Sequence, residues 1–204
     1  IEVFDVATDV TFSGATVTLD PASDLSGETG YYVQVAATAI EDLAGNAYAG
    51  IADQTTLSFT TADVAAPTVS SVSVPADGTY TSGENLDFTV AFSEAVTVTT
   101  TGGTPRLTLT IGSTTRYAAY LSGSGTSSLV FRYAVQSGDA DADGIAVGGA
   151  IDANGGTLKD AAGNAANTAL NSVASTAGVL VDAVVPTLSS SSPADDATGV
   201  AVGT

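Results

Sequence analysis

The chain has 204 residues, of which 44% are hydrophobic and 13% charged, and its 22 acidic and 4 basic residues give a net charge of -18. This apolar content excludes a disordered acidic tail and indicates a folded protein whose acidic surface repels nucleic acid and anionic membranes but favours divalent cations. Because Cys, His, Met and Trp are missing, the chain cannot form disulfides, thiolate or imidazole zinc sites, or the usual Cys and His nucleophile systems.

Segments that alternate apolar and polar residues, rich in β-branched types, predict strands. In chain order these segments are 15–19, 31–35, 56–60, 86–92, 95–99, 106–111 and 129–135. Clusters of Gly, Asn, Asp, Ser and Pro separate them at the spacing of a small antiparallel sandwich, so the sequence predicts an all-β fold. The predicted core residues are Val72, Leu86, Phe88, Val90, Phe92, Val96, Leu107, Leu109, Ile111, Leu129, Phe131, Tyr133, Val135, Ile145, Leu158 and Val179.

Turn and linker motifs occur twice in the chain, about one domain length apart. The motif Asp-x-Ala-Gly-Asn at 42–46 returns at 160–164, which is 118 positions later. The linker motif Asp-x-x-x-Pro-Thr begins at Asp63 and again at Asp182, and Pro-Ala-Asp follows it both times. The spacing is kept across a variable interior, which indicates an internal repeat.

The repeat divides the chain into three expected segments. Residues 1–63 are predicted to be the C-terminal part of one module, 64–182 a complete module and 183–204 the start of a further one, as in an excerpt from a longer tandem array. Pro67 and Pro186 restrict the linkers to extended conformations. We therefore expect modules that are joined by short linkers with limited hinge freedom.

The sequence from Tyr31 to Gly78 carries a family resemblance. It contains YYVQVAATAIEDLAGNAYAG, LSFTTAD and VAAPTVSSVSVPADG, and this order resembles the bacterial immunoglobulin-like repeats of large surface adhesins and S-layer-associated proteins. The resemblance implies tandem immunoglobulin-like β-sandwiches in a secreted or cell-surface protein, with neighbouring modules as partners. It also implies a function as a structural extender that serves adhesion or surface-layer architecture.

The segment richest in possible chemistry is an acidic loop. Asp139, Asp141 and Asp143 occupy alternate positions before Gly144, a pattern by which loops wrap hard cations such as Ca²⁺, and Asp152 is the expected fourth ligand. The loop departs from an EF-hand because Ala150 stands where a bidentate Glu is expected. A solvated acidic turn without a cation is the alternative interpretation.

The repeated aspartates have two interpretations as well. Asp42 and Asp160 begin motifs that close a tight turn by themselves, through the side chain of Asp and the positive φ of Gly. Because each turn is paired in the repeat with a linker aspartate, Asp63 or Asp182, the four residues are also candidates for a calcium site at the module junctions. Bound calcium would then stiffen the array.

An interaction module is the alternative function. It would bind a glycan or a protein, or assemble with copies of itself into a filament in which 183–204 of one chain completes 1–63 of another by strand addition. The aromatic residues considered for a sugar platform are Tyr80, Tyr117, Tyr120 and Tyr133. Tyrosine at strand positions is more often half-buried packing than a binding surface.

Catalysis and membrane insertion are not expected. Glu84, Asp87 and Glu94 are the carboxylates considered for glycoside hydrolysis, but that chemistry also requires a cleft and aromatic residues that stack on sugars, and no pattern indicates either. No apolar run is long enough for a transmembrane segment. We therefore predict a protein that is not an enzyme and does not insert into a membrane.

Overall fold

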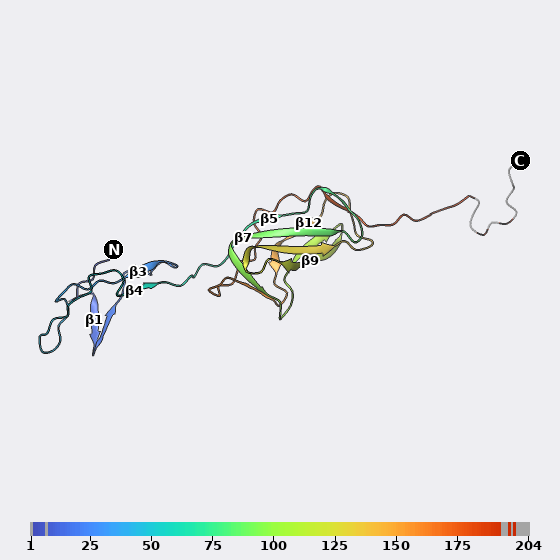
Figure 1. Cartoon of the computed structure of the whole chain (residues 1–204). Helices are drawn as coiled ribbons and strands as arrows, with labels where there is room; N and C mark the ends of the chain where they lie inside the picture. The colour runs from blue at the N-terminus through green and yellow to red at the C-terminus, as the bar shows by residue number, and fades with distance from the viewer. Residues whose placement is uncertain (1, 7, 193–195, 197, 199–204) are drawn as a thin grey trace. The chain divides into compact units, whose positions relative to one another are not determined.

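The computed structural model describes residues 2–6, 8–192, 196 and 198 (Figure 1). The chain divides into two compact units, Ile1–Ala65 and Ala66–Thr204, and the division falls two positions after the expected one at residue 63. All regular elements of the described residues are strands, and no helix occurs among them. The assignment of 183–204 to a further module stays a prediction, because most of 193–204, including Asp195, lies outside the described residues.

The first unit consists of two separate antiparallel ladders. β1 (Val10–Ser13) pairs with β2 (Thr16–Leu19), and β3 (Gly30–Tyr32) pairs with β4 (Ser58–Thr60). None of the described residues of this unit is buried. The first unit therefore has strands but no closed core of its own.

The second unit contains a large sheet and a small one. Its strands are β5 (Val69–Ser73), β6 (Gly78–Tyr80), β7 (Asn85–Thr99), β8 (Arg106–Ile111), β9 (Thr114–Ser122), β10 (Thr126–Ala134), β11 (Ala140–Asp141), β12 (Ala146–Asp152), β13 (Thr157–Lys159) and β14 (Val179–Asp182). The large sheet has the order β12-β8-β9-β10-β7-β13, and β5 also pairs with β7. The small sheet has the order β11-β14-β6, and the pairing of β14 with β6 is parallel, unlike the expected fully antiparallel arrangement.

The long strand β7 unites two predicted strands, 86–92 and 95–99. Its first part pairs with both β5 and β10, and its last residues pair with β13. Ser93 lies at the change of partners, where its N–H donates to the carbonyl oxygen of Thr68 at 2.8 Å and its hydroxyl accepts the N–H of Thr68 at 3.0 Å. These two bonds keep the backbone extended where the sequence pattern predicted a break.

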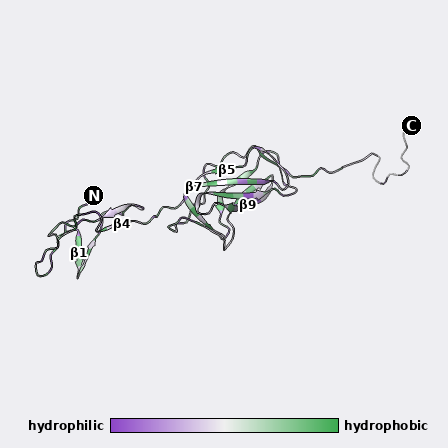
Figure 2. Ribbon diagram, viewed as in Figure 1, coloured by the Kyte–Doolittle hydropathy of each residue, from purple (hydrophilic) through white to green (hydrophobic). Residues whose placement is uncertain are grey.

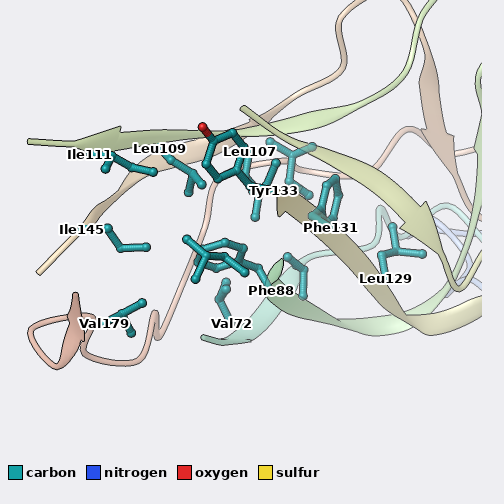
Figure 3. Close-up of a cluster of buried hydrophobic side chains, with 14 of the residues drawn as sticks. Val72, Phe88, Leu107, Leu109, Ile111, Leu129, Phe131, Tyr133, Ile145 and Val179 are labelled. Carbon is teal, nitrogen blue, oxygen red and sulfur yellow. The ribbon is translucent and has the colours of Figure 1, made fainter. Parts of the chain in front are cut away.

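The hydrophobic core lies within the second unit (Figure 3). All the predicted core residues are buried, and Phe88 and Phe131, which are register partners on β7 and β10, are both 0% exposed. The core also includes residues that the sequence patterns missed, namely Val69, Ala118, Ile151, Val181 and Ala183. Most of them lie on strands whose alternation is interrupted by small or polar residues, so the period-two signal was weak.

The backbone enters the second unit beside the middle of β7 and leaves it near the first residues of this strand. The chain begins the unit beside Ser93, through the two bonds to Thr68. It leaves beside the loop after β10, where Ala183 exchanges backbone hydrogen bonds with Gly138 and Asp139 at 2.9 and 2.8 Å. This loop lies near the first residues of β7, because Ala134 is the register partner of Asn85. The points at which the chain enters and leaves this unit therefore lie apart along the first part of β7.

Candidate functional site

Asp139, the first residue of the acidic loop, is a buried anchor with an exposed fraction of 3%. Its Oδ1 accepts hydrogen bonds from both Nε and a terminal nitrogen of Arg116, at 2.9 and 2.6 Å. Its Oδ2 accepts the hydroxyl proton of Tyr133 and the N–H of Gln136, the latter at 2.9 Å. The carboxylate thus ties the loop to β9 and β10.

The hydrogen bonds of this cluster determine its charges. Burial raises the pKa of Asp139, but the bonds from Tyr133, Gln136 and Arg116 outweigh burial, and the pKa lies below the ordinary value. Burial, followed by the bond to Asp139, raises the pKa of Tyr133 to about 12. At neutral pH the cluster therefore holds a carboxylate, a guanidinium and a neutral phenol.

The other predicted loop ligands are also engaged by the protein. Asp141 accepts N–H groups of Gly112 at 2.6 Å and Gly144 at 2.9 Å, which closes the turn, and Asp143 is exposed. Asp152 pairs with Arg106 across the β12–β8 ladder at 2.8 Å. Among the described residues, these predicted ligands form no group of three carboxylates with oxygens within 4.8 Å of one another. Calcium binding by this loop stays a prediction, and the observed bonds favour the structural turn.

The two Asp-x-Ala-Gly-Asn motifs fold in the same way. The carboxylate of Asp42 accepts the N–H and the side-chain amide of Asn46, both at 2.8 Å. The carboxylate of Asp160 accepts the same two groups of Asn164, also at 2.8 Å. Gly45 and Gly163 occupy equivalent positions with φ of 84° and 98°. The repeated sequence therefore produces a repeated turn, as the turn interpretation predicted.

The two linker aspartates also share a local geometry. Oδ1 of Asp63 accepts the N–H of Ala65 at 2.8 Å, and Oδ1 of Asp182 accepts the N–H of Val184 at 3.3 Å. Each side chain closes a short turn that ends two residues before the linker proline, Pro67 or Pro186. The repeat thus preserves the conformation with which the backbone leaves a unit.

Asp160 has an acidic neighbour that the repeat did not reveal. A carboxylate oxygen of Glu94 on β7 lies within 4.8 Å of a carboxylate oxygen of Asp160, which is buried. Burial raises the pKa of Asp160, but the hydrogen bonds from Asn164 and Gly163 outweigh it and hold the pKa below the usual value. Because 66 positions separate the two residues, only the fold brings them together, and no local sequence pattern predicts the pair.

A search of protein families identifies part of the chain. Residues 2–61 match the family model of the bacterial Ig-like domain. This match confirms the predicted resemblance over the first unit and agrees with the all-strand structure. The family consists of non-catalytic modules, and the match suggests a bacterial surface-protein module. Searches of curated proteins and of solved structures found no match.

The tyrosines considered for a sugar platform have separate roles in the unit that follows the Ig-like match. Tyr133 is buried against Asp139, and Tyr120 packs edge-on against Phe131 with ring centroids 5.9 Å apart. The guanidinium of Arg106 lies over Tyr117 at 3.9 Å from the ring centroid. The hydroxyl of Tyr80 donates to the carbonyl oxygen of Ala76. These contacts are the packing that aromatic residues on strands ordinarily make.

The described residues contain no helix long and apolar enough to cross a membrane.

Proposed function

We propose that this chain is a spacer segment of a repetitive bacterial surface protein, in which modules placed one after another supply length for adhesion or for surface-layer architecture. The observation that carries the proposal is the path of the backbone through the second unit. The chain begins this unit beside Ser93, in the middle of β7, and leaves it beside Asp139, near the first residues of β7. A module threaded in this way extends an array instead of folding it back.

The repeated turns and linkers support the same function. A protein whose task is length needs each module to continue the chain in the same way. Here the residues that recur are the turn at Asp42 and Asp160 and the linker aspartates Asp63 and Asp182, with matching hydrogen bonds. The match of 2–61 to the bacterial Ig-like domain agrees with a secreted or cell-surface location.

Calcium is the proposed stiffening ion. Glu94 and Asp160 offer two neighbouring carboxylates. They lie near the beginning of the second unit, because the segment that follows the Asp160 turn contacts Pro67: the N–H of Asn167 donates to the carbonyl oxygen of Pro67 at 2.8 Å. Oxygen ligands of this type suit Ca²⁺. The linker residues Asp63 and Asp182, the turn residue Asp42 and the loop residues Asp139, Asp141, Asp143 and Asp152 stay predictions as further ligands.

We expect about 2 mM calcium to raise the melting temperature of the full chain by roughly 2–6 °C relative to chelator, as a site of extracellular affinity stabilises the folded state by mass action. Small-angle scattering of the same samples should show a narrower distribution of chain dimensions with calcium. Differential scanning calorimetry measures the first effect.

Two matched variants locate the ion. Asp160→Asn and Asp42→Asn each remove the carboxylate from one of the two equivalent turns, but only Asp160 has Glu94 beside it. The calcium shift should vanish in Asp160→Asn and persist in Asp42→Asn, whereas Asp143→Asn tests the acidic loop. A wild-type chain whose melting and scattering are the same with calcium and with chelator would contradict calcium stiffening.

A further inference from the structure

Asn154 is the only asparagine in the sequence that is followed by a glycine. Such a pair is chemically reactive, because glycine has no side chain to hinder an attack by its backbone nitrogen on the neighbouring side-chain amide. Two aspartates, Asp77 and Asp143, are also followed by glycine and are open to the corresponding reaction, in which water is lost instead of ammonia. The fold treats the glycine N–H differently in the three pairs.

In both aspartate pairs the glycine N–H is held in a hydrogen bond. The N–H of Gly78 donates to the carbonyl oxygen of Gly178 at 2.8 Å, and the N–H of Gly144 donates to the carboxylate of Asp141 at 2.9 Å. Gly155, which belongs to the asparagine pair, donates no hydrogen bond in the part of the chain that the structure describes. The nucleophile of the reaction is therefore accessible only in the asparagine pair.

The turn that contains this pair lies on the surface, outside the ladders of the sheet. Both Asn154 and Gly155 are exposed. The turn is closed by one backbone bond, from the N–H of Gly156 to the carbonyl oxygen of Ala153 at 2.8 Å. The side-chain amide of Asn154 donates to the carbonyl oxygen of Thr104 at 3.1 Å. Local opening of this turn frees the amide to approach the N–H of Gly155 while the strands stay paired.

From this difference we infer that Asn154 is a site of deamidation in the folded protein. The backbone nitrogen of Gly155 bonds to the side-chain carbonyl carbon of Asn154 and gives up its proton, and the bond from that carbon to the amide nitrogen breaks, so that ammonia leaves. Water then opens the five-membered imide. Hydrolysis at the side-chain carbonyl gives aspartate, whereas hydrolysis at the main-chain carbonyl gives isoaspartate, in which the backbone runs through the former side chain. Both products carry a new negative charge.

Isoaspartate would form where two backbone loops are in close contact. Gly102 and Gly103 follow β7, and they face Gly155 and Gly156, which precede β13. A Cβ on any of the four would overlap a carbonyl oxygen of the facing loop, so the main chain cannot gain a carbon atom here without moving a loop. β7, which carries hydrophobic residues along its length (Figure 2), pairs through its last residues with β13. Isoaspartate formation should therefore loosen the β7–β13 ladder.

Peptide mapping of the full chain by mass spectrometry, after incubation at mildly alkaline pH with and without urea, tests the site. In the folded chain Asn154 should be converted to aspartate and isoaspartate, while Asn46 and Asn164, which precede alanines, stay intact as internal controls. Isomerisation of Asp77 and Asp143 should be at least about fivefold slower in the folded chain than in urea, because the glycine N–H must first leave its hydrogen bond, whereas deamidation of Asn154 should change by less than this factor. Deamidation of Asn154 in urea alone, or of Asn46 before Asn154 in the folded chain, would overturn the proposal.

Asn154→Asp separates the new charge from the longer backbone. This variant has the charge of the products but a normal main chain, so its melting temperature should differ from that of wild type by less than about 4 °C, as for most exposed substitutions. The isoaspartyl form, separated by chromatography, should melt lower than Asn154→Asp, and the amides of residues 157–159 should exchange their hydrogens faster. Equal melting and equal exchange of the isoaspartyl form and Asn154→Asp would overturn the inferred loosening of the ladder.

Discussion

Gly103→Ala is expected to destabilise the second unit by about 2–4 kcal/mol, the range of forced backbone rearrangement. Two glycine pairs face each other here, Gly102 and Gly103 from one loop, and Gly155 and Gly156 from another. A Cβ at Gly103 would overlap the backbone carbonyl oxygen of Asn154, and φ at Gly103 is 153°. Because backbone faces backbone on both sides, the methyl group can be accommodated only by moving a loop. Urea denaturation of the full chain, followed on the second unit, measures the loss.

Gly149→Ala is the matched control. Gly149 lies in β12 with a negative φ, and a Cβ built there meets nothing within 4 Å. This substitution should leave stability unchanged or raise it by up to about 1 kcal/mol, since alanine reduces the entropy of the unfolded chain. Equal stability of Gly103→Ala and Gly149→Ala would show that the two loops are not packed as described.

Asp139→Asn is expected to cost about 2–4 kcal/mol at pH 7, the range for breaking a buried charge pair on one side. In wild type, one carboxylate oxygen accepts from Arg116 and the other accepts from Tyr133 and Gln136. Asparagine has a single side-chain oxygen, and its NH₂ group cannot accept, so one of these two sets of bonds is lost. The loop after β10 would lose its anchor, and the guanidinium its buried partner. Chemical denaturation of the two proteins at a series of pH values provides the measurement.

The pH dependence has a definite sign. The pKa of Asp139 is lowered in the folded state, so the unfolded chain binds more protons as pH falls. The stabilisation from its charge is therefore complete above the unfolded value of about 4 and is lost as pH falls through the folded pKa. Since Asn does not titrate, the stability difference between the two proteins should be constant above about pH 5 and shrink below about pH 4.

Asp152→Asn controls for the loss of a carboxylate as such. Asp152 also pairs with an arginine, Arg106, but both side chains are largely accessible, at 43% and 30% exposure. Its loss should have little effect, as is usual for exposed pairs. A stability difference between wild type and Asp139→Asn that grew towards low pH would contradict the proposed charge state of Asp139.

Much of the fold could be predicted from the sequence, because one pattern decided it. In 86–92, 106–111 and 129–135 every second residue, counted from Leu86, Leu107 and Leu129, is apolar and lies in the core. β9 was missed because Ala118 is its only buried residue, and a small side chain gives a weak alternation signal. The parallel pairing of β14 with β6 could not be predicted, since it depends on which segments meet across the sandwich.

The ion pairs of the acidic loop could not be predicted from the sequence, because the partner residues are distant in sequence. The expectation of a cation rested on the three aspartates at alternate positions before Gly144, in a stretch with no basic residue between Arg132 and Lys159. The register of the strands supplies the missing charges instead. Arg116 reaches Asp139 from β9, and Arg106 faces Asp152 as its partner across the β12–β8 ladder. Local sequence shows which charges a loop carries, but strand register determines which of them are neutralised.

The parallel pair of β6 and β14 has a mechanical consequence. The chain leaves the second unit through β14, whose Val179–Val181 run alongside Gly78–Tyr80 of β6. In a parallel pair the first residue of one strand and the last residue of the other lie at opposite ends of the ladder. Tension between these two points acts along both strands, so it shears all of their hydrogen bonds together, whereas tension at one end of a hairpin breaks them one after another. The pairing that least resembles the rest of the fold thus joins the early and the final strands in the geometry that best resists extension.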